Sequence, residues 1–197
     1  MREAPLVEQL KKQIAAYVPR NEQEAADQRM MLTFMERNPD CLLRSNLAAH
    51  FSASGWIVNK RRDRVLLCYH KLYDSWSWTG GHADGESDLE AVALREAQEE
   101  TGVHAVSVYP GKIYSLECLY VMGHEKRGAY VPCHIHMNLT YLLEADEEET
   151  LVVNQEENCG VRWFDHDGVL MEPTEPWMVE RVYRKLIERT EAERKNV

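Results

Sequence analysis

Two neighbouring stretches of sequence decide the fold of this chain: Gly80-Gly81-His82-Ala83-Asp84-Gly85-Glu86 and Arg95-Glu96-Ala97-Gln98-Glu99-Glu100-Thr101-Gly102-Val103. The second has helical spacing, so Glu96, Glu99 and Glu100 share one face of a helix that follows a glycine-rich loop. Three carboxylates this close repel one another unless a cation lies among them. Oxygen ligands suit Mg²⁺ or Mn²⁺, which also bind substrate phosphates. The pattern therefore predicts a metal site for phosphate chemistry; the simpler alternative is a solvated acidic helix face.

Both ends of this helix are marked in the sequence. Ser87, with Glu90 three residues later, has the pattern of a capping box at the start of a helix. Gly102 stands where a glycine commonly follows the last helical turn. An apolar stripe lies between them: Leu89, Val92, Ala93 and Ala97. The sequence thus predicts an amphipathic helix between Ser87 and Gly102.

From Arg95 to Val103 the chain resembles the second half of the Nudix box, whose pattern is G-x5-E-x7-R-E-U-x-E-E-x-G-U with U an aliphatic residue. The small Ala97 stands at the first aliphatic position. The first half departs from the pattern, because eight residues rather than seven separate Glu86 from the arginine. Counting from Gly81 restores the total spacing but places Ser87 at the position of the first glutamate.

The resemblance implies roles for the matched residues. In the Nudix family the glutamates that correspond to Glu96, Glu99 and Glu100 bind divalent metals, and the arginine that corresponds to Arg95 orients them. We expect a backbone carbonyl of Gly80 or Gly81 to complete a site for Mg²⁺ or Mn²⁺. Glu86 is expected to reach Arg95 or the metal from its shifted position.

Composition and charge limit the possible partners and compartments. The chain has 197 residues and a formal net charge of −10, which disfavours general binding to nucleic acid or to anionic membrane. No apolar run approaches the ~20 residues that span a bilayer, and the first residues lack a signal-peptide pattern. Five scattered cysteines without a C-x-x-C pair favour reduced thiols in the cytoplasm.

The pattern along the chain predicts a helical N-terminal extension (residues 1–45) and a catalytic domain (residues 46–197). Residues 5–18 and 21–37 have helical spacing, and Met30, Met31, Phe34 and Met35 share one face of the second helix. The extension is expected to pack on the catalytic domain or to form a homodimer.

The catalytic domain alternates strands and helices. Strands are predicted at residues 50–58, 64–70, 103–108, 113–122, 130–143 and 160–164, and a final helix at residues 176–193. This order predicts an α/β protein with an α/β/α sandwich around a mixed sheet, the arrangement that a Nudix fold also implies.

Histidines form a second group of interest. His134 and His136 alternate along a strand and therefore project from one face of the sheet, either as polar lining or as neutral imidazole ligands. From His50 to Val179 the chain is also loosely similar to isopentenyl-diphosphate isomerases, whose metal-binding positions match His50, His82, His134 and His136. This similarity implies a second, imidazole-rich site suited to Zn²⁺ or another transition metal. The essential cysteine of those isomerases corresponds to Gly80 here, which argues against the isomerase activity.

The intact glutamates favour a metal-dependent hydrolase that cleaves a diphosphate linkage in a nucleoside diphosphate derivative or a related small molecule. Glu99 or Glu100 is the expected general base, with Glu156 and Glu157 as alternatives. Tryptophans that could stack on a base or lie in the core are Trp76, Trp78 and Trp177. The competing functions are an isomerase-like enzyme, with an acid and base from His82, His134 or Glu100, and a non-catalytic nucleotide or metal sensor.

Overall fold

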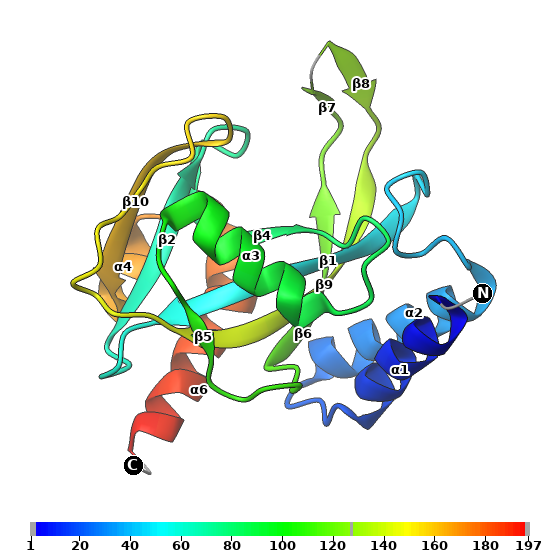
Figure 1. Cartoon of the computed structure of the whole chain (residues 1–197), viewed down its shortest axis with the longest axis horizontal. Helices are drawn as coiled ribbons and strands as arrows, with labels where there is room; N and C mark the ends of the chain where they lie inside the picture. The colour runs from blue at the N-terminus through cyan, green and yellow to red at the C-terminus, as the bar shows by residue number, and fades with distance from the viewer. Residues whose placement is uncertain (1–2, 127, 196–197) are drawn as a thin grey trace.

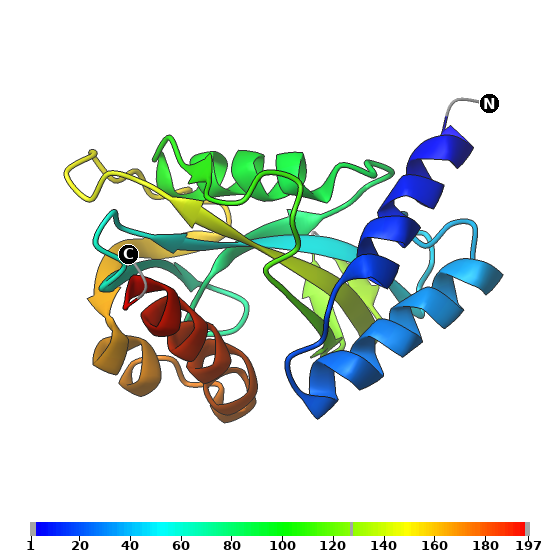
Figure 2. The same cartoon turned by 90° about the horizontal axis from the view of Figure 1, so that it is seen from below.

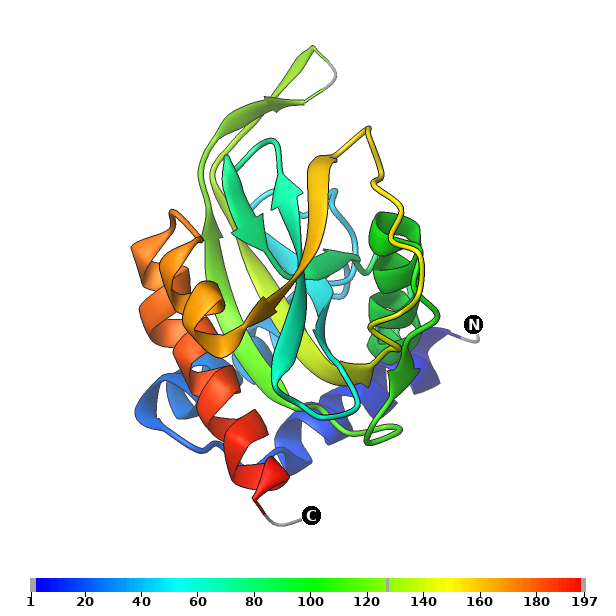
Figure 3. The ribbon, with the colours of Figure 1, turned by 90° about the vertical axis from the view of Figure 1, so that its left-hand side faces the viewer.

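The computed structural model describes residues 3–126 and 128–195, which form three layers (Figure 1). A curled sheet lies in the middle, and α3 (Leu89–Thr101) covers one of its faces. The C-terminal helices cover the other face (Figure 3). They are α4 (His166–Met171), α5 (Pro176–Met178), a π-helical turn η1 (Val179–Tyr183) and α6 (Arg184–Arg194). The predicted α/β/α sandwich is confirmed.

The sheet is mixed, as predicted, because two long strands at its centre run parallel. Its strands are β1 (Ala49–Val58), β2 (Arg64–His70), β3 (Ser75–Ser77), β4 (Thr79–His82), β5 (Val106–Ser107), β6 (Ser115–Val121), β9 (His134–Glu144) and β10 (Asn158–Asp165). The main path is β10-β2-β1-β9-β5, and β3, β4 and β6 pair with β2, β1 and β9. The parallel pairing of β1 with β9 places His50 beside His136 and Ser52 beside Asn138. Residues distant in sequence thus meet on one face of the sheet.

A separate apolar cluster fills each side of the sheet. On the side of α3, Val92 and Ala97 pack among core residues such as Phe51. On the other side, Trp56 of β1 stacks against Tyr183, with ring centroids 5.8 Å apart. Alternation along β1 explains the division, because successive side chains point to opposite faces.

The N-terminal extension forms two helices, α1 (Glu3–Ala16) and α2 (Glu22–Arg37), at one end of the sheet (Figure 2). The side chain of Asn21 caps α2 by accepting a hydrogen bond from the Glu24 N–H, 2.9 Å away. Met31 and Met35 are buried as predicted, but Met30 is 44% exposed and does not join the apolar face. The prediction of a four-residue stripe was therefore wrong at Met30.

The region before α3 differs from its prediction in two respects. The N-cap is Asp88, whose side chain accepts a hydrogen bond from the Ala91 N–H, so Ser87 and Glu90 do not form a capping box. The Glu90 carboxylate instead accepts hydrogen bonds from Ser107 and from the Gly111 N–H. The first part of the glycine-rich segment is strand β4 rather than a loop, with Gly80 and Gly81 paired to Ser54 and Ala53 of β1, and the loop begins only after His82.

A hairpin and a short helix were also not predicted. The long strand expected at residues 130–143 is divided into β8 (Ala129–Val131) and β9, and β8 pairs with β7 (His124–Lys126) as a separate hairpin. The short helix α4 follows β10 and begins at Asp165, whose side chain accepts a hydrogen bond from the Gly168 N–H. Within the described residues, every helix is too short or too polar to cross a bilayer.

Candidate active site

Glu100 is the most deeply buried of the three predicted carboxylates, with 3% of its surface exposed. Its two oxygens accept hydrogen bonds from the Gly80 N–H, 2.9 Å away, and from the Asn158 side-chain amide, 3.0 Å away. Burial raises the pKa of Glu100 to about 7, and these two hydrogen bonds oppose the shift only in part. The carboxylate thus lies against β4, the strand that pairs with β1.

Glu96 lies one helical turn before Glu100 and directly over Gly81. A Cβ built on Gly81 would overlap the Glu96 carboxylate, so only glycine permits this approach. Burial and then the neighbouring charge of Glu99 raise the pKa of Glu96. Glu99 itself is exposed on the same helix face. The three carboxylates repel one another, which fits a hard divalent cation bound by oxygen atoms.

Arg95 forms its ion pair with Glu86, at a distance of 2.7 Å. Glu86 thus reaches the box arginine from its shifted position, as expected. Arg95 acts on Glu96 through its charge, which lowers the pKa of that carboxyl. The direct ion pair of Arg95 is thus with Glu86 and lies outside the glutamate triad, so its orienting role stays a prediction.

The four predicted histidines do come together. Ring nitrogens of His50, His82 and His136 all lie within 4.8 Å of one another. His134 stands beside this group, with its Nε2 3.0 Å from the Nε2 of His136. The structure therefore groups three of the predicted ligands and places the fourth in hydrogen-bond contact with one of them.

Backbone carbonyls determine the tautomers of two of these rings. The Nδ1 of His50 lies 3.0 Å from the Asn46 carbonyl, and the Nδ1 of His134 lies 2.8 Å from the Pro132 carbonyl. Carbonyls only accept hydrogen bonds, so Nδ1 carries the proton in both rings. The Nε2 of His50 then presents a lone pair; it is buried and has no hydrogen-bond partner among the described residues. A buried imidazole nitrogen with a lone pair and no hydrogen-bond partner, such as the Nε2 of His50, is suited to bind a metal.

Burial favours the neutral form of His50, His82 and His136. It lowers the pKa of His50, that of His82 to about 3 and that of His136 to about 2, and protonation of one ring would further disfavour protonation of its neighbours. Neutral imidazole is the form that binds metals. The donor set, nitrogen only, suits Zn²⁺ or a similar transition metal rather than Mg²⁺.

One cleft of about 630 Å³ contains both groups. β4 connects them, because Gly80 and Gly81 contact the carboxylates and His82 belongs to the histidine group. Glu156 and Glu157 line the cleft, and the charge of Glu157 raises the pKa of Glu96 and Glu100. Glu157 is therefore close enough to the carboxylates to affect their pKa, and Glu156 lines the same cleft.

The tryptophans separate into different environments. Trp78 lines the cleft, where it can contact a bound group. Trp76 packs against Phe164, and the guanidinium of Arg162 lies 5.0 Å from its ring centroid. Trp177 is exposed and lies outside the cleft lining.

Ser52 and Ser54 are among the cleft residues that sequence reasoning missed. A signal for them was present, because His50, Ser52 and Ser54 alternate along β1 just as His136 and Asn138 alternate along β9. Alternating polar residues within strands that are otherwise apolar indicate a polar surface on one face of the sheet.

Comparisons with known proteins agree with this geometry. The family model described as NUDIX domain matches residues 49–187. A search of curated protein sequences gave no match. Among solved structures, a Nudix-family hydrolase from Clostridium perfringens has a TM-score of 0.52 at 19% identity, covering 73% of this chain and 97% of that chain.

Two further structures share the fold. The C. elegans Ap4A hydrolase has a TM-score of 0.50 at 15% identity, over 73% of this chain and 95% of that chain. The E. coli dihydroneopterin triphosphate pyrophosphohydrolase has a TM-score of 0.51 at 15% identity, over 71% and 95%. The family model spans more than half of the chain and includes the glutamate helix. The predictions of a Nudix fold and a Nudix-type enzyme are confirmed, and this chain belongs to the Nudix family of hydrolases.

Proposed function

We propose that the chain is a metal-dependent hydrolase that cleaves a diphosphate linkage in a nucleoside diphosphate derivative or a related small molecule. The observation that carries this proposal is the position of the glutamate triad beside β4. Gly80 and Gly81 have no side chains, so the backbone of β4 comes into contact with Glu100 and Glu96. Two structures with the same fold are named as hydrolases of Ap4A and of dihydroneopterin triphosphate, both of which contain linked phosphates.

In this proposal Glu96, Glu99 and Glu100 hold Mg²⁺ or Mn²⁺ together with the carbonyl of Gly81. When bound, such a cation neutralises charge on the diphosphate oxygens and lowers the pKa of an attacking water. Arg95 and Glu86 position the helix that carries the carboxylates.

The proton of the attacking water needs an acceptor within the cleft. Glu99 and Glu100 are the proposed general bases, because both belong to the triad that faces the diphosphate. Glu156 and Glu157 are the alternatives, since they line the same cleft. Bond cleavage consumes one water, and its proton passes to the carboxylate that acts as base while the leaving group departs with the other phosphate.

We further propose a second divalent metal, Zn²⁺ or a similar ion, at His50, His82 and His136, with His134 as a fourth ligand or as the partner that orients His136. Metal content, measured by inductively coupled plasma mass spectrometry on the purified chain, tests this site. We expect His82→Ala/His136→Ala to lose the ion, while His104→Ala, which changes an exposed histidine bonded to Glu149, retains it. Equal metal content in all three proteins would refute the site.

A mass-spectrometric screen tests the hydrolase proposal. The panel contains nucleoside triphosphates, nucleotide sugars, dinucleotides and isopentenyl diphosphate, each with Mg²⁺ or Mn²⁺, and Glu100→Gln is the control. Cleavage that disappears in the variant supports the proposal and gives the substrate class. A double-bond shift without phosphate release would favour the isomerase-like alternative, and binding without reaction would favour the sensor.

The substrate in this proposal is a small molecule, with no role for nucleic acid or membrane, and the expected compartment is the cytoplasm. A homodimer formed through residues 1–45 also stays a prediction. Size-exclusion chromatography with light scattering tests the dimer, since a mass near that of one 22.9 kDa chain would exclude it.

A further inference from the structure

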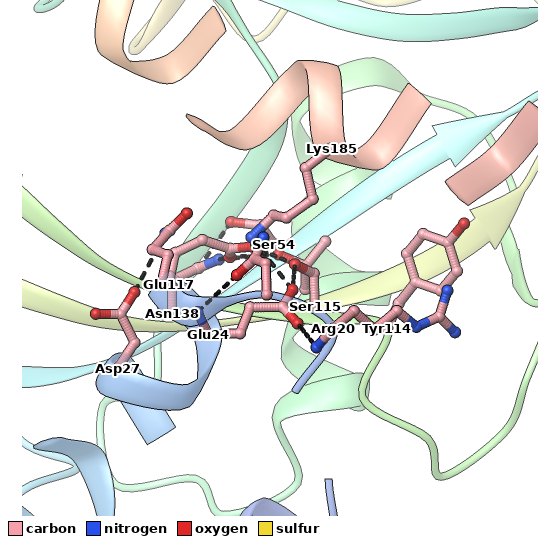
Figure 4. A network of polar contacts seen from close by, with 12 residues as sticks. Arg20, Glu24, Asp27, Ser54, Tyr114, Ser115, Glu117, Asn138 and Lys185 are labelled. Carbon is pink, nitrogen blue, oxygen red and sulfur yellow. Dashed lines mark hydrogen bonds and ion pairs between the residues drawn. The ribbon is translucent and has the colours of Figure 1, made fainter. Parts of the chain in front are cut away.

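A chain of hydrogen bonds determines the chemical character of one part of the cleft. Its cleft end is the group Ser52, Ser54 and Asn138, which we call the polar floor. The pairing of β9 with β1 and β6 places Asn138 between Ser52 and Glu117. Behind it lies a buried network that includes Lys185 of α6 (Figure 4). The polarity of each bond follows from the groups involved.

Lys185 and Glu117 set the direction at the buried end. The Lys185 Nζ, 2.8 Å from Oε1 of Glu117, can only donate, and the carboxylate can only accept. The other oxygen of Glu117 accepts hydrogen bonds from the side chains of Thr140, at 2.9 Å, and Asn138, at 3.2 Å. The Asn138 amide also donates to Thr140, at 3.1 Å. Both amide hydrogens of Asn138 are therefore occupied on the side away from the cleft.

The amide oxygen of Asn138 must then face the serines. Ser54 donates to it at 2.8 Å and Ser52 at 3.2 Å. A hydroxyl has a single proton and two lone pairs, so both serines have used their proton and retain lone pairs. A reversed Asn138 would bring its oxygen against the Glu117 carboxylate, acceptor against acceptor. The polar floor is thus a surface of hydrogen-bond acceptors.

The acceptors lie next to the glutamate triad. A Cβ built on Gly80 would come within 2.6 Å of the Ser54 Oγ, so a larger residue at this position would collide with the hydroxyl. The same Gly80 donates its N–H to Glu100. Gly80 thus contacts both groups, which line the same cleft.

We propose that the polar floor binds a neutral hydrogen-bond donor, a hydroxyl or an amino group, on the organic part of the substrate. This proposal rests on the diphosphate hydrolase proposed above and refines its substrate class. Phosphate oxygens at neutral pH are acceptors and have no favourable partner on a surface of lone pairs. Sugar hydroxyls and the amino groups of bases match it. An unsubstituted alkyl chain, as in isopentenyl diphosphate, gains nothing from it.

The test compares ligands with and without such donors. Stopped-flow tryptophan fluorescence, read before turnover, gives Kd values with Mg²⁺ for ADP, GDP, CDP, UDP, isopentenyl diphosphate and inorganic diphosphate. We expect at least one nucleoside diphosphate to bind more tightly than inorganic diphosphate. The double variant Ser52→Ala/Ser54→Ala loses two hydrogen bonds to the ligand, which should raise that Kd about tenfold. The Kd values of isopentenyl diphosphate and inorganic diphosphate should change by less than about twofold.

Two controls separate recognition from damage to the fold. Ser77→Ala removes another cleft serine, which bonds to Tyr183, and is expected to leave every Kd within about twofold. The second control uses deoxy, O-methyl and desamino analogues of the preferred nucleotide. One of them should bind the wild type about tenfold more weakly than the unmodified nucleotide does. The double variant should bind that analogue and the unmodified nucleotide equally well. That result identifies the donor that meets the serines.

Three outcomes would overturn the proposal: equal weakening of all ligands, unchanged nucleotide binding in the double variant, or no preference for any nucleoside diphosphate over inorganic diphosphate. Failure of the hydrolase proposal looks different. Selective, serine-dependent binding without cleavage of any compound would refute hydrolysis and leave the polar floor as a recognition site.

Discussion

At the scale of single residues, the glutamate triad depends on a glycine as much as on its carboxylates. Glu96 occupies the space that a side chain at position 81 would fill. The sequence pattern predicted the triad because its spacing is local. It did not predict that Gly81 would serve through its missing side chain, since this requires β4 and α3 to be in contact.

Gly81→Ala should lower kcat/KM by about tenfold or more, because small misplacements of catalytic groups have effects of this size. The Cβ must displace the Glu96 carboxylate from β4. Steady-state kinetics on the substrate found in the screen, beside a thermal melt, measure this. Activity equal to wild type would mean that Glu96 can move without consequence.

Thiol reactivity tests residue environments independently of function. Burial raises the pKa of the thiols of Cys41, Cys68 and Cys118, whereas Cys133 and Cys159 are exposed. When the native chain is treated with a chromogenic disulfide at pH 8, two of its five cysteines should therefore react rapidly and the others slowly. The coloured thiolate that the reagent releases measures both rates. Rapid reaction of all five in the native state would contradict this burial pattern.

At the scale of elements, the N-terminal helices are joined to the C-terminal helix by buried charges. Glu24 of α2 is fully buried and contacts Arg189 and Lys185, the latter at 3.3 Å. Glu117 of β6 completes a neutral set of two acids and two bases (Figure 4). These contacts join α2 to α6 and β6.

Glu24→Gln should destabilise the fold by about 3–5 kcal/mol, because removal of one member of a buried ion pair leaves the other charge uncompensated. Urea denaturation at pH 7 measures the change. Glu22→Gln, an exposed glutamate of the same helix, is the matched control and should change stability by less than about 0.5 kcal/mol. Similar losses in both variants would show that the buried pair contributes nothing specific.

The same carboxylate predicts an acid dependence. Burial alone would raise the pKa of Glu24, but the Arg20 N–H and the charges of Arg189 and Lys185 outweigh it and lower the pKa below its usual value of 4.5. A depressed folded-state pKa contributes stability that is present above the unfolded pKa and is lost as the pH falls through the folded value.

Urea midpoints measured from pH 6 down to pH 2 should therefore fall for the wild type below about pH 4.5. Glu24→Gln should show a shallower fall over the same interval, because it lacks this titration. Parallel curves for the two proteins would exclude Glu24 as a source of acid sensitivity.

Local patterns predicted most elements, and the errors have physical causes. Glycine is unfavourable in strands, so Gly80 and Gly81 were taken for a loop, although pairing with β1 makes them part of β4. Asp88 and Ser87 are both favourable N-cap residues for α3. Which of them caps the helix depends on the path of the chain from β4 to α3, and a local pattern does not give that path. The pair of Glu24 and Arg189 was out of reach, because 165 residues separate them.

At the scale of the whole molecule, one cleft combines oxygen ligands, nitrogen ligands and a polar floor. His134 and His136 were predicted to share a sheet face, and the register of β1 with β9 places His50 beside His136. The serines were missed, because their importance comes from the hydrogen-bond network behind them rather than from any motif. Sequence thus indicated the proposed metal-binding residues better than those that line the rest of the cleft.

The parallel pairing of β1 with β9 also has a consequence for biosynthesis. The hydroxyl of Ser52 and its partner Asn138 are 86 residues apart, and Glu24 is 165 residues from its partner Arg189. Contacts of such long range slow folding. Almost the whole chain must therefore leave the ribosome before Arg189 can pair with Glu24, and until then the nascent protein exposes strands that have no partners.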